Sequence, residues 1–156
     1  MARWYYRIVQ RQRVGSAMDG EGARLYGGRW NPPGMAAVYL AATRSLAMVE
    51  ILVHAPREAL SVEWSVIPVG IPEAGIQTVE EKDLPAGWRD LPWSASARQF
   101  GKQWLEQGQS LALEIPSAVV PEESVVLINP RHPEFSSLEI AEPERFSFDP
   151  GLHRGG

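Results

Sequence analysis

The sequence contains no cysteine and no long hydrophobic run. Without cysteine the chain has no disulfide bond, thiolate metal ligand or cysteine nucleophile, which fits a reducing compartment such as the cytosol. No apolar stretch approaches the roughly 20 residues that a membrane-spanning helix needs. The N-terminus, MARWYYRIVQRQR, also lacks the apolar core of a signal peptide. We therefore expect a cytoplasmic protein that makes no contact with membranes.

Histidine is scarce and the net charge is small. His54, His132 and His153 are too widely spaced for a metal-binding motif, so we expect no metal site. The formal net charge of −4 at pH 7 and the pI near 5.4 give no field that would draw the whole chain to nucleic acid. Any anion-binding site must therefore be local.

The composition is typical of one folded domain. The chain has 156 residues, of which 44% are hydrophobic and 22% are charged, and this size is sufficient to bury a single core. We expect residues 1–156 to form one domain. The charged, proline-rich tail from about residue 141 is expected to pack only at its periphery.

Residue patterns predict an α+β fold with mixed small sheets and flanking helices. About five or six short strands are expected, and the clearest are residues 4–10, 36–41, 62–71, 110–121 and 125–130. Pro68 and Pro72 favour an edge position, or an early end, for the third of these strands. Residues 16–28 are expected to form a loop and residues 72–93 a long surface connection.

Two helices have clear boundaries in the sequence. The first follows Thr43, a good N-cap residue, and ends before Pro56. The second begins near Ser94, which is also a good N-cap residue, and ends at Gly108.

The stretch GGRWNPPG places one arginine in a constrained loop. Gly27 and Gly28 let a ligand approach the backbone closely, and the prolines fix the exit of the turn. Arg29 held in this way can bind a pyrophosphate or a carboxylate through two parallel hydrogen bonds. Trp30 beside it can stack on a ring or close a hydrophobic lid. The alternative is structural, with Arg29 paired to a carboxylate and Trp30 in the core.

Four further polar residues lie in apolar surroundings. Glu50 lies in the middle of the helical stretch LAMVEILVH, where a partly buried carboxylate needs a partner or a catalytic task. Ser117 follows a strand, and its hydroxyl either binds a ligand or satisfies the local backbone; no GxSxG motif surrounds it. Arg7 and Tyr39 are strand residues whose polar ends either line a cleft or cap the core.

Several motifs occur together in a specific order. They are WYYRIV at 4–9, GxxxYGGRWNPPG at 22–34, VYLA at 38–41, AMVEILVH at 47–54, WL at 104–105, IPSAVV at 115–120 and LINPRHPEF at 127–135. In this order the motifs resemble the RES-domain family, the toxins of bacterial RES–Xre toxin–antitoxin pairs. The family's arginine, glutamate and serine fall on Arg29, Glu50 and Ser117. Its tyrosine falls on Tyr39 and its early arginine on Arg7.

The resemblance implies a fold similar to the diphtheria-toxin-like ADP-ribosyltransferases and an activity that consumes NAD as substrate. An NAD glycohydrolase or phosphorylase cleaves the nicotinamide–ribose bond; the alternative is a mono-ADP-ribosyltransferase that modifies a host-cell protein. The resemblance also implies a homodimer and inhibition by a cognate Xre-type antitoxin, whose helix-turn-helix domain binds DNA. A binding module without enzymatic activity is a third interpretation.

Carried over from the family, the expected site residues take different parts of the NAD molecule. Arg29 and Arg7 hold the pyrophosphate, Tyr39 stacks on the nicotinamide, and Glu50 stabilises the cationic ribose. Ser117 is expected to hydrogen-bond the ribose or the amide. The expected catalytic residues are Arg29, Tyr39, Glu50 and Ser117, and the expected NAD-binding residues are Arg7, Arg29, Trp30, Tyr39 and Ser117.

Overall fold

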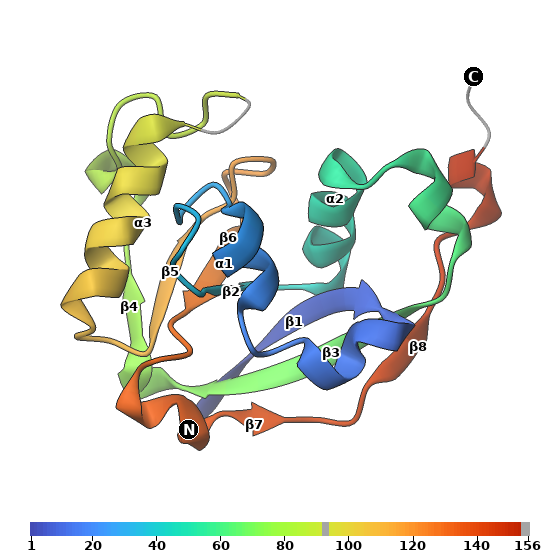
Figure 1. The fold of residues 1–156 in the computed structure, drawn as a ribbon, viewed down its shortest axis with the longest axis horizontal. Coiled ribbons are helices and arrows are strands. Elements are labelled where there is room, and N and C mark those ends of the chain that lie inside the picture. Colours follow the sequence, from blue (N-terminus) through green and yellow to red (C-terminus); the bar gives the residue numbers. More distant parts are fainter. Residues whose placement is uncertain (92–93, 154–156) are drawn as a thin grey trace.

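The computed structural model describes residues 1–91 and 94–153, which form an eight-stranded sheet with three α-helices around it (Figure 1). The α+β class expected from the sequence is confirmed. The strands are β1 (Ala2–Gln10), β2 (Val38–Ala41), β3 (Trp64–Pro72), β4 (Ile76–Thr78), β5 (Ala112–Pro116), β6 (Ser124–Ile128), β7 (Glu139–Ile140) and β8 (Glu144–Phe146). The α-helices are α1 (Glu21–Tyr26), α2 (Arg44–His54) and α3 (Ala95–Gln107).

The sheet consists of two halves with a narrow junction. The strand order is β4-β5-β6-β2-β1-β3-β7, and β8 pairs with β3 beside β7. Strands β1 and β3 pair over their whole length, whereas β1 and β2 share the single register pair Tyr6 and Ala41. Figure 1 shows the two halves strongly turned relative to each other, with α2 beside the junction. The expected small sheets are thus two parts of one bent sheet.

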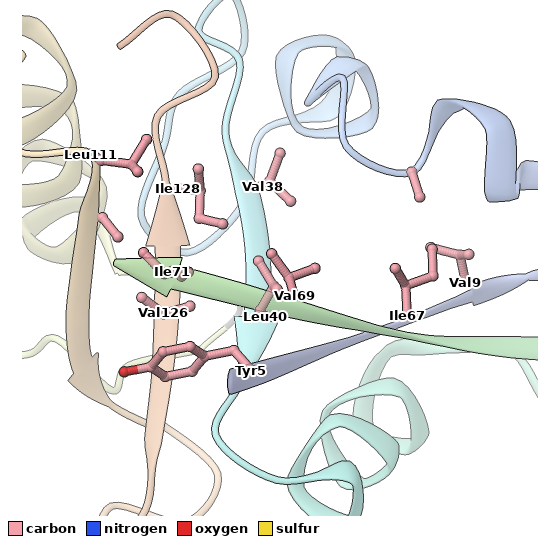
Figure 2. Close-up of a cluster of buried hydrophobic side chains, with 12 residues drawn as sticks. Tyr5, Val9, Val38, Leu40, Ile67, Val69, Ile71, Leu111, Val126 and Ile128 are labelled. Atoms are coloured by element: carbon pink, nitrogen blue, oxygen red, sulfur yellow. The ribbon is translucent and has the colours of Figure 1, made fainter. Parts of the chain in front are cut away.

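A cluster of mostly aliphatic side chains, which also includes Tyr5, lies between the two halves (Figure 2). Val38 and Leu40 of β2 belong to this cluster, whereas Tyr39 points to the opposite face and packs against a second cluster. This alternation of successive strand side chains places the Tyr39 side chain on the face that carries α3. Complete burial of a Val or Leu side chain contributes about 1.5–3 kcal/mol, so these strands are firmly anchored.

Both expected α-helices are confirmed, together with their ends. The Thr43 hydroxyl accepts a hydrogen bond of 3.0 Å from the Leu46 N–H at the start of α2. The Ser94 hydroxyl accepts one of 3.1 Å from the Ala97 N–H at the start of α3. Helix α3 ends at Gly108, whose φ of 61° is the left-handed conformation that favours glycine.

The expectation for residues 16–28 was wrong in part, because this segment contains α1. The glycine-rich composition indicated a loop, but the Asp19 carboxylate accepts a hydrogen bond of 2.9 Å from the Glu21 N–H at the helix start. Gly20 before the helix has a φ of 73°. A helix of 6 residues is too short to leave a periodic pattern in the sequence.

The position expected for β3 at an edge was also wrong. Strand β3 lies between β1 on one side and β7 and β8 on the other. Pro68 lies between the stretches that pair with β8 and β7, and its carbonyl accepts a hydrogen bond of 3.0 Å from the Ala141 N–H. The backbone nitrogen of Pro68, which carries no hydrogen to donate, therefore faces the gap between two short partner strands, where a proline is tolerated.

The segment 72–93 is more structured than expected. It contains β4, which pairs in parallel with β5, and it buries Leu84 and Trp88. Residues 92–93 of this segment lie outside the described residues. The tail also packs more closely than expected, since β8 pairs with β3 and the Phe148 ring lies 5.6 Å from the Trp64 ring. Within the described part of the chain, no helix has the length and apolar character needed to cross a bilayer.

Candidate active site

A cleft of about 750 Å³ opens between β1, β2, α1 and α2. Its volume falls in the range of small-molecule and cofactor sites. Five of the six residues expected in the site line this cleft: Arg7, Arg29, Trp30, Tyr39 and Glu50. The sixth, Ser117, is fully buried directly behind Glu50.

The loop that carries Arg29 is held from its buried side by Asn31. The Asn31 amide nitrogen donates hydrogen bonds of 2.9 and 3.0 Å to the carbonyls of Ala23 and Met35, and its oxygen accepts one from the Tyr39 hydroxyl. The Gly28 N–H closes the turn on the Asn31 carbonyl at 3.0 Å. Asn31 was not identified from the sequence, although an asparagine before two prolines is a turn signal.

Arg29 is fixed by the segment before α3. Its Nη1 donates hydrogen bonds of 3.0 and 3.2 Å to the carbonyl oxygens of Trp88 and Asp90. Burial lowers the pKa of the Arg29 guanidinium, and the nearby Glu50 carboxylate acts in the opposite direction. In the part of the chain that is described, these hydrogen bonds use Nη1 alone, which leaves the other guanidinium donors for an anion in the cleft.

Glu50 and Ser117 form a hydrogen-bonded pair. The Ser117 hydroxyl donates a hydrogen bond of 2.7 Å to Glu50 Oε1 and accepts bonds of 3.0 Å from the N–H groups of Val119 and Val120. Ser117 itself is inaccessible to solvent. Its hydroxyl thus orients one carboxylate oxygen from behind, while the carboxylate faces the cleft.

Tyr39 lines the cleft with its ring while its hydroxyl is buried. The hydroxyl donates to Asn31 Oδ1 and accepts a hydrogen bond of 3.3 Å from the Trp30 N–H. Burial raises the pKa of the Tyr39 phenol, so the group stays protonated at neutral pH. The polar end of Tyr39 therefore supports the arginine loop and leaves the ring for contact with a ligand.

Arg7 connects three segments of the cleft wall. Its Nε donates a hydrogen bond of 2.7 Å to the Ala17 carbonyl, and its Nη1 donates one of 3.0 Å to the Tyr39 carbonyl. Burial lowers the pKa of Arg7, and the Asp19 carboxylate partly offsets this effect. Arginine nevertheless keeps its charge in proteins, so Arg7 contributes positive potential to the cleft.

Trp30 packs mainly in the core and is only 2% exposed. Its ring stacks on Trp88 at a centroid distance of 6.0 Å and meets the edge of Phe100 at 6.0 Å. These contacts link the arginine loop to α3 and to the segment that holds Arg29. The described residues contain no group of three histidine or acidic side chains that could hold a metal ion.

The fold thus brings Arg29, Tyr39 and Glu50 to one cleft. Comparison with known proteins gives the family of the chain. A family model described as the RES domain matches residues 5–149. The chain belongs to the RES domain family. Its fold is also that of a solved structure, a Mycobacterium tuberculosis MbcT–MbcA toxin–antitoxin complex, with a TM-score of 0.78, 18% identity and coverage of 99% of this chain and 88% of that chain.

Curated relatives of this RES domain are named as toxins or as an NAD(+) phosphorylase. A protein named Toxin Res from Yersinia enterocolitica is 43% identical over 148 residues, which cover 94% of this chain and 97% of the relative. A protein named Prs ADP-ribosylating toxin from Sphingobium sp. is 33% identical over 159 residues, which cover 99% of both. A stretch of 36 residues, 22% of this chain and 19% of the relative, is 56% identical to the NAD(+) phosphorylase MbcT of M. tuberculosis.

Ser117→Ala tests whether the buried serine of this RES domain positions Glu50. The change leaves two backbone N–H groups without their acceptor, and we expect a loss of about 1–3 kcal/mol in the free energy of unfolding. Because one oxygen of the Glu50 carboxylate also loses its donor, we expect kcat to fall about tenfold or more with little change in KM. Urea unfolding and steady-state kinetics measure the two effects. A loss of stability with unchanged kcat would limit Ser117 to a structural role.

Proposed function

We propose that this RES domain is the toxin of a toxin–antitoxin pair and that it consumes NAD by cleaving the nicotinamide–ribose bond. The observation that carries the proposal is the convergence of the Arg29 guanidinium and the Glu50 carboxylate on one cleft, beside the Tyr39 ring. The names of the relatives, which include a NAD(+) phosphorylase and an ADP-ribosylating toxin, support the same chemistry.

Cleavage of this bond requires charge stabilisation more than a strong protein nucleophile. Pyridinium nicotinamide leaves as a neutral molecule, and the ribose passes through a transition state with oxocarbenium character. The Glu50 carboxylate, held by Ser117 at 2.7 Å, places a fixed negative charge where this positive charge develops. Such preorganised electrostatics is usually the largest contribution to catalysis.

The other residues hold the dinucleotide. Arg29 binds the pyrophosphate with the guanidinium donors that face the cleft, and Arg7 adds positive potential from the cleft wall. The Tyr39 ring packs against the nicotinamide. Trp30 acts mainly by keeping the arginine loop on α3, since its ring is nearly buried.

Incubation of the purified chain with NAD tests the proposal. We expect rapid release of free nicotinamide without any added protein acceptor. Chromatography of the products measures this release. The second candidate is a protein ADP-ribosyltransferase, which the full-length similarity to the Sphingobium toxin favours. It predicts nicotinamide release that depends on an acceptor protein and labelling of that protein. Binding of NAD with no release of nicotinamide under either condition would contradict both candidates.

The partner proposed for this chain is an antitoxin that covers the cleft. The fold match to a toxin–antitoxin complex supports this assignment. We further propose that the antitoxin is of the Xre type and binds DNA through a helix-turn-helix domain, that the toxin acts as a homodimer, and that it acts in the cytoplasm. Co-purification of this chain with the antitoxin tests the partnership, and light scattering of the complex measures whether the toxin is a homodimer.

A further inference from the structure

The cleft extends over both faces of strand β1. Successive side chains of a strand point to opposite faces, so Ile8 packs with α2 whereas Val9 packs with Ala17. All three residues line the cleft. Glu50 of α2 therefore lies at one end of the cleft. The opposite end, which we call the far end, is formed by the residues of segment 13–26 that line the cleft.

Arg7 connects the two ends of the cleft. Its guanidinium donates to the Ala17 carbonyl at 2.7 Å and to the Tyr39 carbonyl at 3.0 Å, which is one acceptor from each end. In the proposed function the nicotinamide ribose lies at Glu50, and the pyrophosphate lies at Arg29 and Arg7. The adenosine half of the dinucleotide, which is joined to the other phosphate, then reaches the far end.

Asp19 presents a fixed carboxylate at the far end. Its N–H donates to the Ser16 carbonyl at 3.2 Å, and its Oδ1 accepts from the Glu21 N–H at 2.9 Å. Gly20, the next residue, approaches the Ala37 backbone so closely that a Cβ atom would lie 3.0 Å from the Ala37 nitrogen. Among the described residues no group donates a hydrogen bond to Oδ2 of Asp19, so this oxygen can accept one from a ligand.

The far end carries no surplus of positive charge. Arg13 and Asp19 both line it and offset each other, while Glu21 is paired with Arg24 by hydrogen bonds of 2.5 and 3.0 Å. Two apolar side chains of α1 also line the far end and are more than half exposed: Leu25 and Tyr26. Apolar and aromatic surfaces of this kind can pack against an adenine ring.

Building on the proposed function, we propose that Asp19 accepts a hydrogen bond from the 2′-hydroxyl of the adenosine ribose and thereby makes the enzyme specific for NAD over NADP. A carboxylate selects NAD by the same hydrogen bond in dinucleotide-binding proteins of another fold. NADP carries a phosphate on this hydroxyl, so the proton is missing and about two negative charges face the carboxylate. Arg13, which Asp19 already offsets, does not compensate for these charges.

The test measures nicotinamide release by the purified chain with NAD and with NADP as alternative substrates. For the native chain we expect kcat/KM to be about 100-fold or more higher with NAD. Asp19→Asn keeps the oxygen that accepts the Glu21 N–H and replaces the other oxygen by an N–H donor. It should lower this ratio about tenfold or more, through a higher KM for NAD and a lower KM for NADP. Asp83→Asn is the matched control, because Asp83 is exposed and does not line the cleft.

The outcomes separate this inference from the function on which it depends. Comparable cleavage of NAD and NADP by the native chain overturns the inference and leaves NAD cleavage intact. An unchanged ratio in Asp19→Asn, with both substrates affected equally, also overturns it and limits Asp19 to support of Arg7. Absence of nicotinamide release from either substrate contradicts the proposed function. Calorimetric titration with the two dinucleotides then tests Asp19 by the same ratio of Kd values, and absence of binding overturns the inference as well.

Discussion

Glu50→Gln is expected to lower the rate of nicotinamide release on the order of 100- to 1,000-fold while the melting temperature stays nearly unchanged. Glutamine keeps the shape of the side chain and an oxygen that can accept the Ser117 hydrogen bond, so the packing of α2 is preserved. The negative charge opposite the developing ribose cation is lost. Chromatography of nicotinamide and differential scanning fluorimetry measure the two quantities on the same preparation.

In a bacterial host the same substitution is expected to abolish growth arrest and the fall in cellular NAD that follows induction of the native chain. Glu142→Gln is the matched control, because this carboxylate is exposed and does not line the cleft. The control should behave as the native chain. Near-normal turnover of purified Glu50→Gln would remove Glu50 from the catalytic role.

Gly101→Ala is expected to cost about 3 kcal/mol or more in the free energy of unfolding, which is a large part of the stability of a domain this size. A Cβ atom at this position would lie 1.7 Å from the Trp30 carbonyl oxygen and 2.6 Å from its carbonyl carbon. Both atoms belong to the backbone, so neither a rotamer change nor a small side-chain shift relieves the clash. The change should also displace the loop that carries Arg29.

The experiment compares urea unfolding of Gly101→Ala with that of Gly15→Ala. Gly15 lies in an exposed 3-10 turn, and a Cβ there meets no atom within 4 Å. We expect the control to stay within about 0.5 kcal/mol of the native chain. If both variants unfolded at the same urea concentration as the native chain, α3 would not pack on the arginine loop as described.

The ends of α2 and α3 were predictable because they depend on local chemistry. A serine or threonine that caps a helix acts on an N–H group three positions later, and both caps are present as expected. The Tyr39 side chain points away from Val38 and Leu40 for a similarly local reason, because successive side chains of a strand point to opposite faces of the sheet. These features need only residues that are neighbours in the sequence.

The elements missed from the sequence depend on distant partners. Strand β4 has three residues and exists because β5, more than thirty positions later, pairs with it. Strand β8 pairs with β3 in a similar way. The place of Pro68 inside the sheet follows from a gap between β7 and β8, which no pattern near Pro68 indicates.

The sequence by itself determined the types of side chain available to this protein: arginines in a constrained glycine-proline loop and in a strand, a carboxylate in an apolar helix, and no thiol. Only the tertiary structure decided which groups each of them meets. The Ser117 hydroxyl is bound to Glu50 across 67 positions, and Arg29 is held by a carbonyl 59 positions away. The physical reason is that hydrogen bonds require contact within about 3 Å, and only the folded sheet brings such distant residues that close.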